Sequence, residues 1–265
     1  MLKITALSTL CADLFYGTDI IRPGGEALNF AMVASRIPDV QISLIGAIGN
    51  DKYGEAILSD LRTANIDISS VYQLNNSPTA THMTYLTPNG DRYYKEDSWN
   101  GGALDAFKRL NTQDVDKIKA SDVVFCDVYC PFLNNIIELK KNSSFKLAVD
   151  FNTMNNTEYF EAISPYIDFF LISGQSGTNC ILEALTKKFD CYYNITFAEN
   201  GSRTYYRGVA YDTPAVKASV VDTTGAGDSY HAGFVVTLMQ TSDIIVSMEV
   251  GSRLASQVIS RYGGY

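Results

Sequence analysis

The segment Val220–Phe234 (VVDTTGAGDSYHAGF) holds the residue types best suited to chemistry. An extended run leads into the turn Gly225-Ala226-Gly227, and a helix is expected to begin near Asp228. Backbone N–H groups at a helix start lack partners within the helix and favour an anion in front of them. Small residues let that anion approach closely. The pattern predicts an anion site beside a carboxylate, although aspartate is also common at helix starts simply as a cap.

Such an arrangement suits phosphoryl transfer. The reaction needs in-line positioning and stabilisation of the negative charge on the transferring oxygens. An acceptor alcohol also needs a base within hydrogen-bond reach, and a carboxylate is sufficient. The arrangement is therefore compatible with phosphoryl transfer to a hydroxyl group.

The stretch from residue 222 to residue 233, DTTGAGDSYHAG, resembles the C-terminal signature of the ribokinase-like (PfkB) sugar kinase family. This resemblance implies that Asp228 is the catalytic base and that Gly225, Ala226 and Gly227 form the anion hole. It also implies ATP as the phosphoryl donor and Mg²⁺ as its cofactor.

An N-terminal segment, Pro23–Asn29 (PGGEALN), resembles the first signature of the same family. The resemblance implies that Gly24, Gly25 and Asn29 contact sugar hydroxyls, as does an aspartate near the end of the first strand, which by position is Asp13. Carboxylate and amide side chains suit this task because they accept or fork hydrogen bonds. Taken singly, these residues could form an ordinary turn and a solvated loop; their joint spacing favours a binding site.

The nucleotide is expected near a third segment, TFAENG, which resembles the family's T-x-G-x-x-G. The resemblance implies nucleotide contacts from Thr196, Glu199 and Gly201, and Thr223 of the C-terminal signature joins them. The usual glycine after the threonine is replaced by Ala198.

Magnesium is harder to place. The family often has an N-x-x-E segment whose acid helps to order the metal, whereas Ser173–Thr178 (SGQSGT) contains no acid. The D-x-N at Asp150–Asn152 resembles a family segment near phosphate or metal-bound water. The metal ligands therefore stay unassigned. Asp51, in another family-like segment, is expected to cap a helix.

Short apolar runs alternate with helical patterns along the chain, which predicts a parallel sheet covered by helices on both faces. The fold class is α/β, a three-layer α/β/α body with a central, mostly parallel sheet, in one domain spanning residues 1–265. Predicted strands are Ile4–Ser8, Ser43–Ile45, Val123–Asp127, Leu147–Asp150, Asp168–Ile172 and Tyr192–Phe197. Predicted helices are Ala27–Ile37, Tyr53–Ala64, Phe132–Lys141, Thr157–Ile163, Ser176–Lys187, Ala226–Gln240 and Asp243–Arg261.

One region breaks this alternation. Two extended runs flank a turn signal at Pro88-Asn89-Gly90, and a further short run lies near residues 18–22. These strands predict a small β lid from about residues 14–23 and 71–98, or else an edge hairpin of the main sheet. A lid with exposed tyrosines at its edge would invite a homodimer.

Composition narrows the function classes. The chain has 265 residues, 46% of them apolar, and a formal net charge of −8. That charge argues against nucleic-acid binding, which needs a clustered basic surface. Neither a signal peptide nor a membrane span is expected, and five cysteines without CxxC spacing suggest reduced thiols in the cytoplasm. A P-loop and a dinucleotide fingerprint are both missing.

The layout and the ending ISRYGGY are similar to those of fructoselysine and fructosamine kinases. The resemblance implies an acceptor hydroxymethyl group on a fructosamine or a fructose-like ketose. Ribokinase or nucleoside kinase specificity is the enzymatic alternative, and a sugar-binding protein with little turnover is the other.

Overall fold

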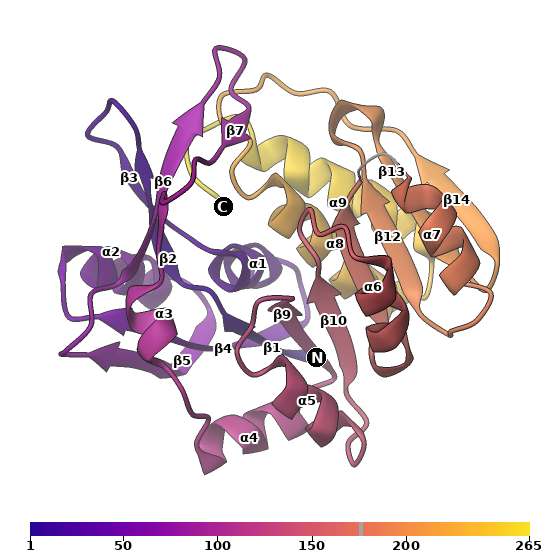
Figure 1. The fold of residues 1–265 in the computed structure, drawn as a ribbon, viewed down its shortest axis with the longest axis horizontal. Coiled ribbons are helices and arrows are strands. Elements are labelled where there is room, and N and C mark those ends of the chain that lie inside the picture. The colour runs from indigo at the N-terminus through magenta and orange to yellow at the C-terminus, as the bar shows by residue number, and fades with distance from the viewer. Residues whose placement is uncertain (175–176) are drawn as a thin grey trace.

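The computed structural model describes residues 1–174 and 177–265, and its central feature is a nine-stranded sheet. The strand order is β14-β13-β12-β11-β10-β9-β1-β4-β5 (Figure 1). The strands are β1 (Leu2–Ser8), β4 (Val40–Gly49), β5 (Ile66–Leu74), β9 (Val123–Asp127), β10 (Lys146–Asp150), β11 (Phe169–Ser173), β12 (Tyr192–Thr196), β13 (Ser202–Tyr206) and β14 (Val209–Thr213). All neighbours pair in parallel except β12–β13 and β13–β14.

Helices cover both faces of this sheet, which confirms the predicted three-layer α/β/α class. One face carries α1 (Glu26–Ala34), α2 (Lys52–Thr63), α8 (Ala226–Thr241) and α9 (Ile244–Val258). The other carries α4 (Thr112–Lys119), α5 (Leu133–Lys140), α6 (Thr157–Ile163) and α7 (Thr178–Leu185), with α3 (Gly102–Ala106) between β4 and β6. Short 3₁₀ turns lie at η1 (Ser164–Tyr166) and η2 (Ala198–Asn200).

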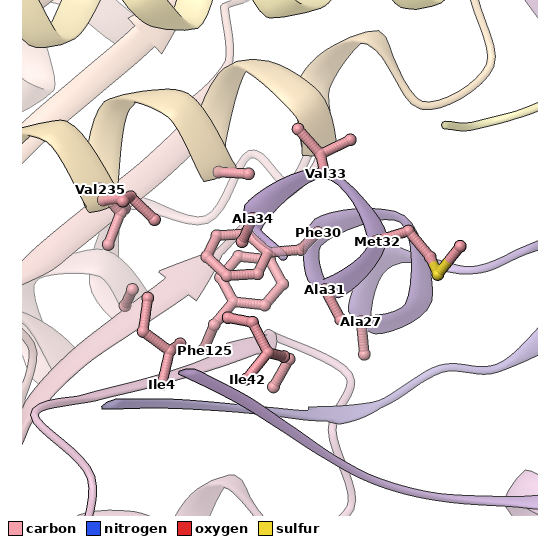
Figure 2. Packing of buried hydrophobic residues seen from close by; sticks show 14 of the residues in the cluster. Ile4, Ala27, Phe30, Ala31, Met32, Val33, Ala34, Ile42, Phe125 and Val235 are labelled. Carbon is pink, nitrogen blue, oxygen red and sulfur yellow. The ribbon is translucent and has the colours of Figure 1, made fainter. Parts of the chain in front are cut away.

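Burial on both faces explains why the central strands are continuous apolar runs. In β9, Val123 and Phe125 face the core beneath α1 and α8, whereas Val124 and Cys126 face the opposite core. Figure 2 shows α1 packed on the sheet through Phe30, whose ring stacks on that of Phe125 with centroids 3.9 Å apart. This packing fixes α1, and with it the segment that holds several predicted site residues.

A separate five-stranded sheet stands above one end of the body (Figure 1). It contains β3 (Ile21–Gly24), β2 (Cys11–Phe15), β6 (Ala80–Leu86) and β7 (Arg92–Tyr93) in that order, with β8 (Trp99–Asn100) also paired to β6. We call it the small sheet. The hairpin is therefore not an edge of the main sheet.

The borders of the small sheet differ from those expected from the sequence. Its first strand starts at Cys11 rather than near residue 14, and residues 71–74 belong to β5 of the central sheet. The reason is that β5 is a half-buried edge strand, so its alternating pattern resembles that of the hairpin that follows. The described residues contain no helix long and apolar enough to span a membrane.

Candidate active site

The turn before α8 is held in one conformation by its neighbours. Gly225 caps the helix in the left-handed region, with φ 73°, and a Cβ atom placed there would lie 2.2 Å from the carbonyl oxygen of Gly264. Glycine is thus required for both conformation and space. The helix begins at Ala226, the start predicted for the helix Ala226–Gln240, so Asp228 lies within its first turn. The buried Asp222 fixes the loop that leads into this turn. Its Oδ1 accepts hydrogen bonds from the N–H and the hydroxyl of Thr224.

Three amide groups at this turn are available to a ligand. The N–H of Ala226 donates to the carbonyl of Thr223 at 3.2 Å. Within residues 1–174 and 177–265, the N–H groups of Gly225, Gly227 and Asp228 make no hydrogen bond. Free amides at the positive end of a helix form a site for phosphate-like anions.

Asp228 meets Asn29 across the fold. The Nδ2 of Asn29 in α1 donates to the Oδ2 of Asp228 in α8 at 2.7 Å, and both side chains are buried. The Oδ1 of Asn29 is buried and has no hydrogen-bond partner among the described residues, which leaves one acceptor unsatisfied at this contact. Two segments singled out separately in the sequence therefore meet in the fold.

The electrostatic setting of Asp228 suits a base that works near neutral pH. Burial raises its pKa to about 7, and the nearby charges of Glu26 and Asp150 add to this effect. The hydrogen bond from Asn29 and the positive charge of Arg92 act in the opposite direction. A carboxylate with a pKa near 7 accepts a proton more readily than an ordinary one.

Asp13 lies in β2 of the small sheet, not at the end of the first strand as the sequence suggested. A Cβ atom at Gly24 would fall 2.2 Å from its Oδ2, so the glycine lets the carboxylate approach the neighbouring strand. Its Oδ1 accepts from the hydroxyl of Thr84 at 3.4 Å. Burial raises the pKa of Asp13 to about 7, and Arg92 opposes the rise. Gly25, the residue after Gly24, is the N-cap of α1, at φ 106°.

Further acids that the sequence left aside or held weakly lie near this site. Asp127 and Asp150 end the neighbouring parallel strands β9 and β10, where ligand sites of open α/β sheets form. Asp150 is within 3.1 Å of the Nδ1 of His231, which is buried as expected for a packed histidine. Burial raises the pKa of Asp127 to about 7, and Glu26 adds to the rise. Position at a strand end was the signal that could have identified Asp127.

The residues predicted to contact nucleotide lie in two places. Thr196 ends β12, Glu199 is exposed in η2, and the carbonyl of Gly201 accepts from the N–H of Phe197 at 2.8 Å. A groove of about 430 Å³ adjoins this turn. It is lined by Asn179, Phe197, Asn200, Ser202, Arg203, Asp212, Thr213 and Pro214.

Thr223, the fourth predicted nucleotide residue, contacts the small sheet instead. Its hydroxyl accepts from the N–H of Arg92 at 3.0 Å, and its own N–H donates to the carbonyl of Gly90 at 3.2 Å. The tip of the small sheet is thus bonded to the loop that leads into the anion site.

The structure describes only part of Ser173–Thr178, the segment without the expected acid, because Gln175 and Ser176 lie outside the described residues. In the rest of the chain no three His, Cys, Asp or Glu side chains are grouped as metal ligands. Mg²⁺ does not need such a group, because it keeps several waters and binds through one or two carboxylates and substrate phosphates. The strand-end acids Asp127 and Asp150 are compatible with that mode of binding.

Fold and site together define a phosphotransferase that acts on a small molecule. Residues 20–265 match the family model described as pfkB family carbohydrate kinase, and the chain belongs to that family. It is accordingly an ATP-dependent carbohydrate kinase.

Relatives agree with this placement. The chain is 26% identical to a protein named fructosamine kinase FrlD from Bacillus subtilis, over 100% of this chain and 93% of the relative. It is 25% identical to a ribokinase from Lactococcus lactis, over 100% and 94% of the two chains. A solved structure of Arabidopsis thaliana ribokinase complexed with ribose and ATP superposes with a TM-score of 0.82 at 19% identity, covering 99% of this chain and 93% of the other.

Proposed function

We propose that this kinase transfers the γ-phosphoryl group of ATP to a hydroxymethyl group of a fructosamine or a fructose-like ketose, with Asp228 as the general base. The observation that carries the proposal is the 2.7 Å hydrogen bond from Asn29 to Asp228, which brings the expected sugar-binding segment to the expected base. The relative named fructosamine kinase supports this acceptor class.

In the transfer step, the acceptor oxygen attacks the γ-phosphorus while its proton passes to the carboxylate of Asp228. The new O–P bond forms as the bond between the γ-phosphorus and the β,γ-bridging oxygen breaks, and ADP leaves with the electron pair. The free N–H groups of Gly225 and Gly227 hold the oxygens of the transferring group. Ala226 provides the small residue between them.

The acceptor is held from two sides in this proposal. Asp13 and the unpartnered Oδ1 of Asn29 accept hydrogen bonds from sugar hydroxyls. Gly24 and Gly25 are assigned to the same binding segment, where the missing Cβ of Gly24 lets the Asp13 carboxylate pack against the neighbouring strand. We also propose that the small sheet acts as a lid that covers the bound acceptor.

For the nucleotide, the turn from Thr196 through Glu199 to Gly201 is assigned to ATP contacts, and Thr223 is assigned to the nucleotide site from its place in the loop just before the anion turn. Bound Mg²⁺ would neutralise phosphate charge, and Asp150 would hold it through water. Removal of divalent ions with EDTA should abolish turnover, and added Mg²⁺ should restore it; turnover that persists in EDTA contradicts this assignment.

A homodimer through the small sheet is also part of the proposal. Tyr16 and Tyr93 on its outer face are exposed by 65% and 43%, an unusual concentration of aromatic surface. Light scattering coupled to size-exclusion chromatography should give twice the chain mass, and a monomer at every concentration would contradict it.

The test of the reaction is ADP release with Mg-ATP across fructosamines, fructose, ribose and nucleosides, with Asp228→Asn as the control. One fructosamine or ketose should stimulate release, and the variant should lose at least about 10²-fold in kcat. Preference for ribose would favour the ribokinase alternative, which the Lactococcus lactis relative supports. Sugar binding by calorimetry without ADP release would replace the kinase proposal with a binding protein.

A further inference from the structure

The segment Tyr262–Tyr265 (YGGY), which we call the strap, lies between the small sheet and the body of the fold (Figure 1). The ring of Tyr262 meets the ring of Phe15 in β2 edge-on, with centroids 5.5 Å apart. A Cβ atom at Gly263 would lie 3.3 Å from the Cγ of Arg22 in β3. The strap therefore borders two strands of the small sheet.

One end of the strap is fixed beside the anion turn, residues 225–227. The N–H of Gly263 donates to the Oδ2 of the buried Asp222, in the loop before the turn, at 2.9 Å. A Cβ atom at Gly225 would lie 2.2 Å from the carbonyl oxygen of Gly264. The backbone of the strap thus packs directly on the turn that begins α8.

The middle of the strap packs on the side-chain amide of Asn29. A Cβ atom at Gly264 would lie 2.3 Å from the Oδ1 and 2.5 Å from the Nδ2 of Asn29. Because interiors are close-packed, a planar amide held at this range cannot turn about its last bond unless the strap moves. The orientation that the strap preserves is the one in which Nδ2 donates to Asp228 at 2.7 Å.

The other end of the strap is fixed to α2. The hydroxyl of Tyr265 donates to the Oδ2 of Asp60 at 2.7 Å, across 205 positions of the chain. The Tyr265 ring packs, partly buried, against the core beneath α1 and α8. Gly264, which packs on Asn29, is therefore held between two hydrogen-bonded neighbours in the chain.

We infer that Tyr265 is a positioning residue for phosphoryl transfer, because its hydrogen bond to Asp60 holds Gly264 against Asn29 and so keeps Asn29 bonded to the base. Tyr265 contacts neither the acceptor nor ATP in this inference and acts only through the strap. The inference rests on the proposed role of Asp228, and it applies whichever hydroxyl compound is the acceptor.

Tyr265→Phe removes the hydroxyl and keeps the ring. ADP release is measured with the fructosamine or ketose that the wild-type protein turns over fastest. We expect kcat to fall by about 5–10-fold, the size of one lost hydrogen bond, with the KM for ATP unchanged. Asp60→Ala should give the same loss. Asp60→Asn should stay close to wild type, because its side chain keeps an oxygen that accepts from Tyr265.

Tyr211→Phe is the matched control for the loss of a tyrosine hydroxyl. Tyr211 packs against the same core, and its hydroxyl has no hydrogen-bond partner in the described part of the chain. Its kcat should equal that of the wild-type protein. A loss equal to that of Tyr265→Phe would show a general effect on the core and overturn the inference.

The decisive comparison adds Tyr265→Phe to Asn29→Leu. Residues that act through one contact are not additive, so the second change should cause no further loss of kcat. A further loss of about 5–10-fold would mean that the strap acts elsewhere, and it would overturn the inference. Wild-type kcat in Tyr265→Phe, together with lost turnover in Asp228→Asn, would overturn the inference and leave the proposed function intact. Full activity in Asp228→Asn would overturn both.

Discussion

The amide nitrogen of Asn29 lies 2.7 Å from the Oδ2 of Asp228, although the two residues are 199 positions apart in the chain. The bond fixes the carboxylate in one orientation and leaves its other oxygen free to face an acceptor. It also stabilises the charged form of the carboxylate, opposing the effect of burial on the pKa. This one hydrogen bond therefore both orients the carboxylate and stabilises its charged form.

Asn29→Leu tests the charge effect. Loss of the hydrogen bond should raise the pKa of Asp228 above about 7, because the charged form loses a stabilising donor. Since the base acts deprotonated, the rising limb of kcat/KM against pH should move upward by about one pH unit. Steady-state kinetics between pH 5.5 and 9, at roughly half-unit steps, gives the measurement. An unchanged limb with reduced kcat would show that Asn29 acts by position alone.

Thr223→Val tests the contact between the small sheet and the anion-site loop. The variant cannot accept from the N–H of Arg92, and the small sheet should close less firmly over the acceptor. We expect a rise in the KM for the acceptor by about 5–10-fold, the size of one lost hydrogen bond. Thr87→Val is the control, because its hydroxyl accepts only within the hairpin, from the N–H of Asp91. Equal effects in both variants would attribute the change to the hairpin itself.

Local motifs pointed to part of this candidate site. The glycine turn with its aspartate predicted an anion site from its residue types, whereas the hydroxyl site at the segment containing Asn29 was implied by the resemblance to the family's first signature. The alternation of buried strands and helices likewise predicted the central sheet. The ends of elements were less certain. The helix predicted over Ala27–Ile37 spans Glu26–Ala34 in the structure, because terminal turns and capping residues allow several boundaries.

Residues that reach the site only through tertiary contacts could not be found in this way. Arg92 follows a hairpin turn and looks like an ordinary exposed residue until Thr223, 131 positions later, holds its backbone. The pairing of Asp150 with His231 spans 81 positions. Nothing in the local sequence of Asp13 shows that a second strand, β2, carries it into the small sheet.

Asp51→Ala tests how α2 and the small-sheet segment are joined. Partial burial raises the pKa of Asp51, but the hydrogen bonds from Gly54, Thr79 and Tyr53 outweigh it and hold the pKa below its ordinary value. The variant should lose about 1–2 kcal/mol of unfolding free energy, measured in urea at pH 7. Because the folded pKa is depressed, this difference is fully present above the unfolded pKa of about 4 and is lost as pH falls through the folded value. A difference that persisted undiminished at pH 2 would contradict the account.

Gly264→Ala tests the close packing of the C-terminal backbone against the Asn29 amide. A Cβ atom at position 264 would lie 2.3 Å from the Oδ1 and 2.5 Å from the Nδ2 of Asn29, so the amide must move away from Asp228. We expect kcat/KM to fall by about 10-fold, with the rising limb of the pH profile displaced upward as in Asn29→Leu. Residues that act through one contact are not additive, so the double variant should be little worse than Asn29→Leu alone. Additive losses would mean that Gly264 acts on the anion turn through Gly225, which also packs against it.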